Sequence, residues 1–566
     1  MNRSFAQLVV LALVLITFSS CSSTPKAPIP ANAAFVLHIN GKSLNEKLPW
    51  SEVKESQWFK LASAEAGGDS LVKVLMNDPA QSGIDIKSDA WVFVANRGKG
   101  AYAAFSCTLS DAKKLESLIK TANPQAKIQQ KESTSYIGEG NSLMSWNGSR
   151  LLVLGDASSL NNSLNGGGSY DEYSESGNSN AYGTDSLLAI AQELYSLKSS
   201  NKLGDNSKFA DLIDTKGDVH FWMNAGSLYN NSMASSLLSL SKISNLLEGN
   251  IATATIAFND GAIQIDSKSY VGKELEALYK KYQASNFDEE MLKNLPAGDV
   301  NMALGMNYPP EGLKAFLSLL GVDGLANTFL QEAGFSMDEF VKANGGNLFL
   351  ALSDFKIAQQ EKTIEGFGDE PYTYTTTEPA GKLVFGAEVK ERSAFQKMMD
   401  VAKKLLTEKA GMSEEDMSKI PYQLKDKWFL AGNESSQIAQ YGSSKTNHAF
   451  IDRIKGHPIG MFVNIASLIK GSMAAIGEAP LGKGIAELSL KLWKDIVLTG
   501  GEFEGGASIS HITLSLGDEK TNSLKSLNQY FGQLAKLAKE DQDRRQAEWE
   551  MNDPDVVADT TAVPLN

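Results

Sequence analysis

Short stretches of alternating apolar and polar residues recur along the chain in pairs, with turn-forming residues between the two members. Residues 251–258 (IATATIAF) and 262–271 (AIQIDSKSYV) flank Asp260-Gly261, and residues 495–503 (DIVLTGGEF) and 507–516 (ASISHITLSL) flank Gly505-Gly506. Period-two alternation is typical of half-buried antiparallel strands. Asp-Gly and Gly-Gly turns favour hairpins because such turns need positive φ. Paired stretches at residues 90–109 and 347–389 predict two more strand pairs.

Each predicted strand pair is followed by a stretch with helical periodicity. In the last one, five apolar residues recur at helical spacing, and we expect this stripe to pack in the core. They are Leu524, Leu527, Phe531, Leu534 and Leu537. Each pair is also preceded by one strand and one helix, so the repeating order is β-α-β-β-α, as in the split arrangement of ferredoxin-like units.

A short phrase repeats ahead of these helices and organises the chain. Residues 209–228 read FADLIDTKGDVHFWMNAGSL, and residues 450–468 read FIDRIKGHPIGMFVNIASL. Related endings occur at residues 34–44 (AFVLHINGKSL) and, more weakly, at 299–313 (DVNMALGMNYPPEGL). The four phrases place Asn40, Asn224, Asn307 and Asn464 where a strand passes into a helix. We interpret these asparagines as structural repeat positions, since Asn caps helices and tolerates left-handed φ.

The repeats predict an α+β fold of two tandem homologous halves, residues 34–285 and 295–539. Each half is expected to contain two β-α-β-β-α units with antiparallel sheets and helices on one face. Residues 161–184 form a Ser-, Asn- and Gly-rich insertion in the first half, which we expect to be flexible. Residues 356–381 form an insertion in the second half that is compatible with a projecting hairpin. Residues 540–566 predict a charged helix end and a disordered tail.

The N-terminus has the pattern of an export signal. Arg3 precedes an apolar stretch at residues 5–18 that is too short to span a bilayer comfortably, and small residues then precede Cys21. Residues 18–21 resemble a bacterial lipobox, with Phe18 where Leu is commonest. The resemblance implies a signal peptide at residues 1–20, acylation of Cys21 and anchoring in a membrane. An ordinary secretory signal with a chance cysteine is the alternative.

Residues 21–33 follow as a tether that contains three prolines, which favour an extended backbone. Neither an Asp nor an acidic run follows Cys21. In bacterial lipoproteins these features resemble signals for inner-membrane retention and for surface export, respectively. We therefore expect the periplasmic face of the outer membrane rather than the cell surface.

Composition narrows the choice of partner. The formal net charge of −14 argues against nucleic acid, which is bound by neutralising phosphates with Lys and Arg. The only cysteine besides Cys21 is Cys107, which alternates with apolar residues in a predicted strand. We expect a buried thiol there rather than a catalytic one.

No motif in the sequence specifies a reaction. Residues 477–484 (GEAPLGKG) match the phosphate-loop spacing, but Gly484 stands where Ser or Thr would hold magnesium, so we expect a turn between helices and no nucleotide. The five histidines lack the spacing of a zinc site, and no nucleophile elbow is present. The recurring Asp211 and Asp452 are interpreted as capping residues. The sequence predicts no catalytic residue, no metal and no cofactor.

Taken together, the lipobox, the Pro-rich tether, the opening AFVLHIN and the duplicated phrase resemble a family of Bacteroidota lipoproteins catalogued as a domain of unknown function. The resemblance brings no catalytic residues with it. The sequence thus favours a non-enzymatic binding or scaffolding lipoprotein, whose partner is an envelope protein or a glycan. An envelope hydrolase acting on glycan or peptide is one alternative. A carrier that holds an apolar ligand between the halves is another, and a large apolar cleft at that place is the observation that favours it.

Overall fold

The computed structural model describes residues 28–65, 78–98, 100–157, 182–229, 246–322, 324, 330–331, 334–364, 372–443, 445–476 and 480–552. The predicted signal peptide, Cys21, nearly all of the insertion at 161–184 and the end of the tail lie outside these ranges. The described chain is a mixed α and β fold built on one large antiparallel sheet of 18 strands. The expectation of an α+β fold with antiparallel pairing is therefore confirmed at this level.

The sheet is assembled from two sets of strands that are contiguous in the sequence. The N-terminal set comprises β1 (Ala33–Ile39), β2 (Ala90–Arg97), β3 (Gly100–Thr108), β4 (Gln129–Lys131), β5 (Thr134–Glu139), β6 (Ser142–Trp146), β7 (Arg150–Asp156), β8 (Val219–Asn224), β9 (Ile251–Asn259) and β10 (Ala262–Tyr270). The C-terminal set comprises β11 (Val300–Asn307), β12 (Asn344–Ile364), β13 (Tyr372–Val389), β14 (Tyr422–Lys425), β15 (Trp428–Gly432), β16 (Ile459–Val463), β17 (Trp493–Glu504) and β18 (Ala507–Leu516).

Hydrogen-bonded pairing gives a continuous order across the sheet. The N-terminal set runs β4-β5-β6-β7-β3-β2-β1-β8-β9-β10. The C-terminal set continues as β18-β17-β16-β11-β12-β13-β15-β14. The two sets meet where β10 pairs with β18, and in the middle of that pairing Asp266 lies opposite His511. Their side chains are hydrogen-bonded, with His511 Nδ1 2.6 Å from Asp266 Oδ1.

The helices fall into groups along the chain. Those of the first part are α2 (Gly41–Lys47), α3 (Trp50–Glu55), α4 (Gln57–Glu65), α6 (Ala112–Ala122), α8 (Thr184–Tyr195), α9 (Ser207–Asp214), α10 (Ala225–Tyr229) and α13 (Lys273–Lys281). The second part has α14 (Glu290–Lys293), α15 (Pro310–Leu320), α17 (Met337–Ala343), α18 (Arg392–Ala410), α19 (Glu414–Ser418), α20 (Ser435–Gln440), α21 (Ile451–Ile454), α22 (Ile465–Ile476), α23 (Pro480–Leu492) and α24 (Ser523–Asn552).

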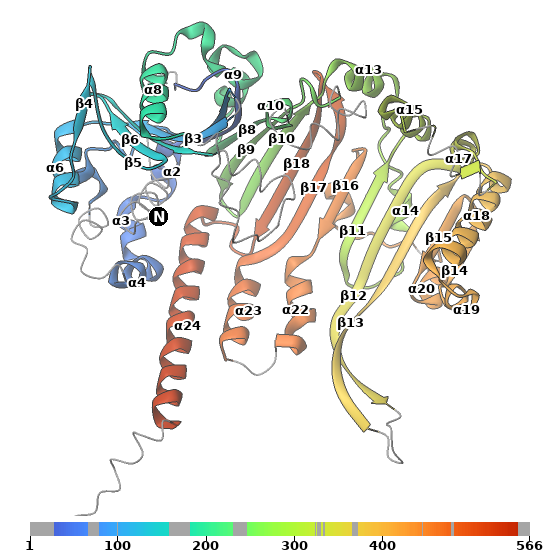
Figure 1. Ribbon diagram of the computed structural model, residues 1–566. Coiled ribbons are helices and arrows are strands. Elements are labelled where there is room, and N and C mark those ends of the chain that lie inside the picture. The colour runs from blue at the N-terminus through green and yellow to red at the C-terminus, as the bar shows by residue number, and fades with distance from the viewer. Residues whose placement is uncertain are drawn as a thin grey trace, which may run out of the picture.

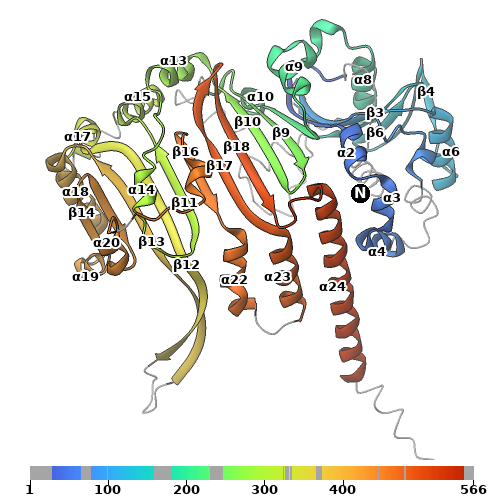
Figure 2. The same ribbon diagram turned by 180° about the vertical axis from the view of Figure 1, so that it is seen from behind.

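Figures 1 and 2 show how these helices are placed around the central strands. Helices α13 and α15 lie at one end of the central strands, and α22, α23 and α24 project from the other end. The ribbon of β12 and β13 continues past the sheet in the same direction as those three helices. This ribbon includes the predicted insertion at 356–381, whose strands pair as far as Ile364 and Tyr372.

Strand alternation divides the core around the N-terminal strands into two layers. Val36 of β1 is buried with Phe93 and with the apolar face of α8, whereas its neighbours Leu37 and Ile39 face a second cluster with Trp146. The C-terminal strands enclose a separate core around Phe349 and the short helices α14, α20 and α21. Successive side chains of β1 point to opposite faces of the sheet, and both faces carry apolar residues, so β1 is buried on both sides.

The turns follow the predicted chemistry in two places and differ in a third. Gly261 has φ +68, and Gly505 and Gly506 have φ +58 and +79, as hairpins with Asp-Gly and Gly-Gly turns require. The segment GEAPLGKG was expected to be a turn, but its last residues belong to α23, which begins at Pro480. Proline suits the first turn of a helix, where its missing N–H has no partner to lose.

Candidate functional site: an apolar cleft beside the last helix

A cleft of about 590 Å³ opens between the start of α24 and the N-terminal strands. We call it the apolar cleft, because Asn528 is the only lining residue with a polar side chain apart from the indole of Trp58. Both views place the first turns of α24 beside α3 and α4. The lining residues are Leu37, Ile39, Leu44, Leu48, Val53, Trp58, Val219, Phe258, Leu524, Leu527, Asn528 and Phe531.

One wall of the apolar cleft is the apolar stripe of α24. Leu524 packs against two core clusters, but Phe531 is 52% exposed. The expectation that the whole stripe is core is therefore wrong. The physical reason is that α24 runs on past the end of the sheet, so the strands cover only its first turns. A half-covered apolar stripe of this kind marks a surface that a ligand can bury further.

The opposite wall depends on one of the repeated asparagines. Asn40 follows β1 and caps α2, since its Oδ1 accepts a hydrogen bond from Ser43 N–H at 3.1 Å. Its Nδ2 donates to Gly217 O at 3.1 Å, which ties the cap to the loop before β8. Helix α2 starts in this fixed position, and its residue Leu44 and the C-cap residue Leu48 then reach the cleft. The cap therefore sets the shape of this wall.

A buried carboxylate holds the same helix from its other side. Asp218 is 0% exposed and accepts hydrogen bonds from Ser43 Oγ at 2.5 Å, from Lys47 Nζ at 2.6 Å and from Phe258 N–H at 2.5 Å. A buried charge is tolerated only when it is paired and hydrogen-bonded. Asp218 meets that condition, and it joins α2 to β8 and β9, which supply the cleft residues Val219 and Phe258.

Polar and charged contacts join α24 to α3 and α4 next to the apolar cleft. Trp58 Nε1 donates to Asn528 Oδ1 at 2.8 Å across the gap between α4 and α24. Lys525 Nζ lies 2.7 Å from Glu52 Oε1 on α3. These contacts hold α24 against α3 and α4 while the apolar interior between them stays open. Sequence reasoning missed Trp58 and Phe258, which line the cleft together with the apolar residues of α24.

Two histidines lie behind the cleft on the other face of the same strands. His38 and His220 are opposite one another in the β1–β8 pairing, and their Nδ1 atoms are 2.9 Å apart. His220 Nε2 donates to Thr215 O at 2.8 Å, and His38 Nε2 lies 3.4 Å from Asp89 Oδ2. His220 Nδ1 of the neutral ring is then an acceptor, so His38 Nδ1 carries the proton between them. Burial lowers the pKa of His220, which keeps this ring neutral near pH 7.

The other repeated asparagines are not brought into one site. Asn224 and Asn464 accept hydrogen bonds from Ser227 N–H at 3.2 Å and Ser467 N–H at 3.0 Å, three residues further on. Asn307 differs, since Pro309 holds the capping position of α15. None of the four adopts left-handed φ, because the described non-glycine residues with positive φ are Glu132, Asp354 and Asp426. Cys21, the predicted lipidation site, lies outside the described residues.

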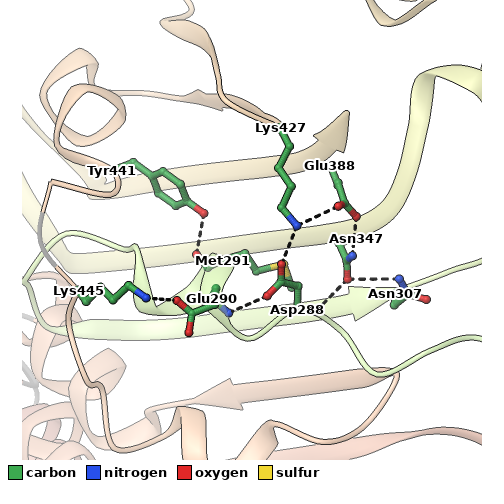
Figure 3. Close-up of polar contacts among 9 residues, drawn as sticks. All are labelled: Asp288, Glu290, Met291, Asn307, Asn347, Glu388, Lys427, Tyr441 and Lys445. Carbon is green, nitrogen blue, oxygen red and sulfur yellow. Dashed lines mark hydrogen bonds and ion pairs between the residues drawn. The ribbon is translucent and has the colours of Figure 1, made fainter. Parts of the chain in front are cut away.

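Asn307 belongs instead to a polar cluster in the C-terminal part (Figure 3). Its Nδ2 donates to Asn347 Oδ1 at 3.3 Å, and Asn347 Nδ2 donates to Glu388 Oε2 at 2.6 Å. Lys427 Nζ lies 3.0 Å from Glu388 Oε1 and 2.9 Å from Asp288 Oδ2. One ammonium therefore pairs with two carboxylates, which is the arrangement of a structural network rather than of an acid and base pair.

Three further observations bear on chemistry. Cys107 is buried, as predicted, and this burial raises the pKa of its thiol to about 12. Across the described ranges, no group of three or more His, Cys, Asp or Glu side chains is placed to hold a metal ion. Within the same ranges, no helix combines the length and apolar character needed to cross a membrane.

The N-terminal part of the chain is similar to a known protein family. The model of a family described as a domain of unknown function (DUF4836) matches residues 26–165. No curated protein matches the chain. Among solved structures, crystal forms I and III of TP0453 align at 10% identity with TM-scores of 0.23 and 0.24. They cover 46% and 47% of this chain, and 86% and 90% of theirs.

Proposed function

We propose that this protein is a non-enzymatic binding lipoprotein of the cell envelope that holds an apolar ligand in the apolar cleft. The observation that carries the proposal is the cleft itself, about 590 Å³ of space with almost wholly apolar walls. Ligand sites are typically clefts of roughly 300–1,000 Å³ that combine apolar walls with a few placed polar groups. Asn528, which lines the cleft and accepts a hydrogen bond from Trp58, supplies such a polar group.

The proposal includes the anchor and the location. The lipobox-like residues before Cys21 support acylation by a Bacteroidota-type export route, and the tether that follows supports residence close to the membrane. We place the protein at the periplasmic face of the outer membrane, where an apolar ligand would be a lipid or a lipid-like molecule. Cys21→Ala is expected to move the protein from the membrane fraction to the soluble fraction, and unchanged partitioning would count against the anchor.

The proposal also includes a duplicated architecture of two ferredoxin-like halves. It is supported by the strand order, which reads β3-β2-β1-β8-β9-β10 from one side and β13-β12-β11-β16-β17-β18 from the other. On this view the cleft lies between the halves, since its walls come from the N-terminal strands and from the last helix. Superposition of residues 34–285 on 295–539 tests the duplication directly.

The ligand proposal is tested with an uncharged apolar probe. The full chain should bind N-phenyl-1-naphthylamine saturably, and Leu527→Glu should weaken that binding by at least about tenfold, because a charge placed in an apolar site is strongly disfavoured. Trp549→Glu is the matched control, since Trp549 lies on the same helix but is exposed and away from the cleft. Equal binding by wild type and Leu527→Glu, with both folded, would refute the assignment of this cleft.

A further inference from the structure

A second cleft lies at the other end of the central strands, where the N-terminal and C-terminal parts of the chain meet. It has a volume of about 410 Å³ and is formed by α13 and the residues after it, the start of α15, and β17. We call it the aromatic cleft, because five of its lining residues are aromatic. They are Tyr279, Tyr282, Tyr308, Phe316 and Phe503. Tyr279 is 41% exposed, so its ring is available to a ligand.

Strand β17 has a β-bulge where it borders this cleft. Its register against β18 shifts between Gly500 and Phe503, and Gly501 there has φ +95. A β-bulge of this kind redirects the side chains next to it. The result is that the Phe503 ring stacks on Tyr279, with centroids 5.0 Å apart and an interplanar angle of 10°. The β9–β10 hairpin, which also borders the seam of the sheet, keeps an unbroken register and has no such bulge.

Besides the tyrosine hydroxyls, the polar side chains of the aromatic cleft are amides and carboxylates. Gln283, Asn286, Glu502 and Glu504 line it, and none of its lining residues, all in the described part of the chain, is Lys or Arg. Burial raises the pKa of Tyr308 to about 12, so its hydroxyl remains a donor at neutral pH. The cleft therefore offers aromatic faces together with hydrogen-bond donors and acceptors on planar side chains.

The existing contacts of these groups narrow the ligand class. Glu502 already pairs with His457, and Lys281 Nζ already lies 5.0 Å from the centroid of the Tyr282 ring. These internal partners reduce the attraction of the cleft for a cationic ligand. A purely apolar ligand would cover the side chains of Gln283, Asn286 and Glu504 without offering them hydrogen bonds, which is costly. A sugar ring fits both conditions, because its C–H face packs on aromatic rings while its hydroxyl groups hydrogen-bond at the edge.

We infer that the aromatic cleft binds a neutral glycan, with the Tyr279–Phe503 pair as the platform for a sugar ring. Gln283, Asn286, Glu502 and Glu504 then provide the hydrogen-bonding groups around the ring edge. The inference rests on residues remote from the apolar cleft and is independent of the function proposed for that cleft. A protein with both sites would contact a glycan at one end of the sheet and hold an apolar molecule at the other.

The test is calorimetric titration of the full chain with neutral β-1,4-linked N-acetylglucosamine and glucose oligomers. We expect saturable binding of at least one of them, and at least a tenfold loss of affinity in Phe503→Ala and in Tyr279→Ala. The matched control is Tyr422→Ala, since Tyr422 is an exposed tyrosine on β14, outside the aromatic cleft. The Tm of each variant shows whether it is folded.

Three results would overturn the inference. The first is that no neutral oligomer binds at millimolar concentration. The second is that an oligomer binds with the same affinity to wild type, Phe503→Ala and Tyr279→Ala, which would place the glycan elsewhere. The third is that only a lysine-rich peptide, titrated in parallel, binds and loses affinity in the same variants, which would make the cleft a site for cationic peptides. If Leu527→Glu does not weaken probe binding, the function proposed for the apolar cleft is wrong, but the glycan test at the aromatic cleft is unaffected.

Discussion

The central strands of the two parts of the sheet, β1–β8 and β11–β16, pair in the same antiparallel way. At one matching position, however, the two pairs carry very different side chains. In β1–β8 the two residues that face each other are His38 and His220. In β11–β16 the corresponding pair, also two and four residues before the repeated asparagines, is Gly305 and Gly460. A Cβ at either glycine would come within 3.0 Å of the Phe287 ring. One part thus fills this layer with a polar pair, and the other fills it with an aromatic ring from outside the sheet.

The helix starts beside these strand pairs show a second contrast. Ser43 Oγ donates to Asp218 Oδ1 at 2.5 Å, and Ser467 Oγ donates to Asp299 Oδ2 at 2.6 Å. Asp218 is fully buried and needs Lys47, whereas Asp299 is exposed and the buried partner of Ser467 is Asn301, 2.5 Å away. The same backbone geometry is therefore secured by a buried charge in one part and by a buried amide in the other. The Asp218 carboxylate accepts hydrogen bonds from three donors. Its substitution is therefore expected to destabilise the N-terminal part more than the matching substitution destabilises the C-terminal part.

The largest expected difference comes from removing the two aspartates. Asp218→Ala leaves Lys47, Ser43 and the Phe258 N–H without their acceptor, and breaking a buried ion pair typically costs about 3–5 kcal/mol. Asp299→Ala removes one hydrogen bond at an exposed site, which costs about 0.5–1.5 kcal/mol. Urea denaturation monitored by circular dichroism measures both free energies of unfolding. Equal losses would show that burial of Asp218 has no energetic consequence.

An intermediate difference is expected at the repeated asparagines. Asn464→Val should lower the free energy of unfolding by about 1–2 kcal/mol, because Val has no side-chain oxygen to accept the hydrogen bond from Ser467 N–H that caps α22. Asn307→Val should cost less in helix capping, since Pro309 occupies that position in α15. Chemical denaturation of both variants checks the order, with Asn464→Ser as a variant that keeps a capping oxygen. A larger loss in Asn307→Val would show that its contacts with Ser285 and Asn347 outweigh a helix cap.

The smallest expected difference is one of pH. Burial lowers the pKa of His220 below the ordinary value of 6.5 in the folded state, so the unfolded chain binds more protons. Stability contributed by neutral His220 is therefore fully present above pH 6.5 and is lost as the pH falls from there through its lowered pKa in the folded state. Protonation of His220 is opposed by the nearby His38. It is favoured by the carboxylates of Asp89 and Asp218.

Hydrogen exchange at pH 7.5 and pH 5.5, corrected for intrinsic rates, locates the effect of pH. We expect amides of β1 and β8 to lose protection at pH 5.5, and amides of β11 and β16, with glycines at the matching positions, to retain it. His448 on the C-terminal side also has a pKa lowered by burial, so the loop before α21 is compared separately. Equal loss of protection in both strand pairs would assign the pH response to something other than the histidine pair.

Much of the fold follows from local features of the sequence. The alternation in residues 251–258 and 507–516, together with the Asp-Gly and Gly-Gly turns, predicted β9, β10, β17 and β18 because strand faces and turn conformations depend on neighbouring residues. The burial of Cys107 followed from the same alternation. The Asn-x-x-Ser phrase located the starts of α2, α10 and α22, since a helix cap involves residues only three apart.

The two clefts were decided by tertiary structure alone. The stripe of Leu524, Leu527 and Phe531 has the spacing of a buried helix face, and only the end of the sheet determines that Phe531 remains exposed. The partner of Trp58 lies 470 residues away in the chain at Asn528, and Phe503 reaches Tyr279 only through a bulge against β18. A local sequence pattern predicts which residues lie on the same face of a helix or strand. How much of that face is buried depends on where segments distant in the sequence end.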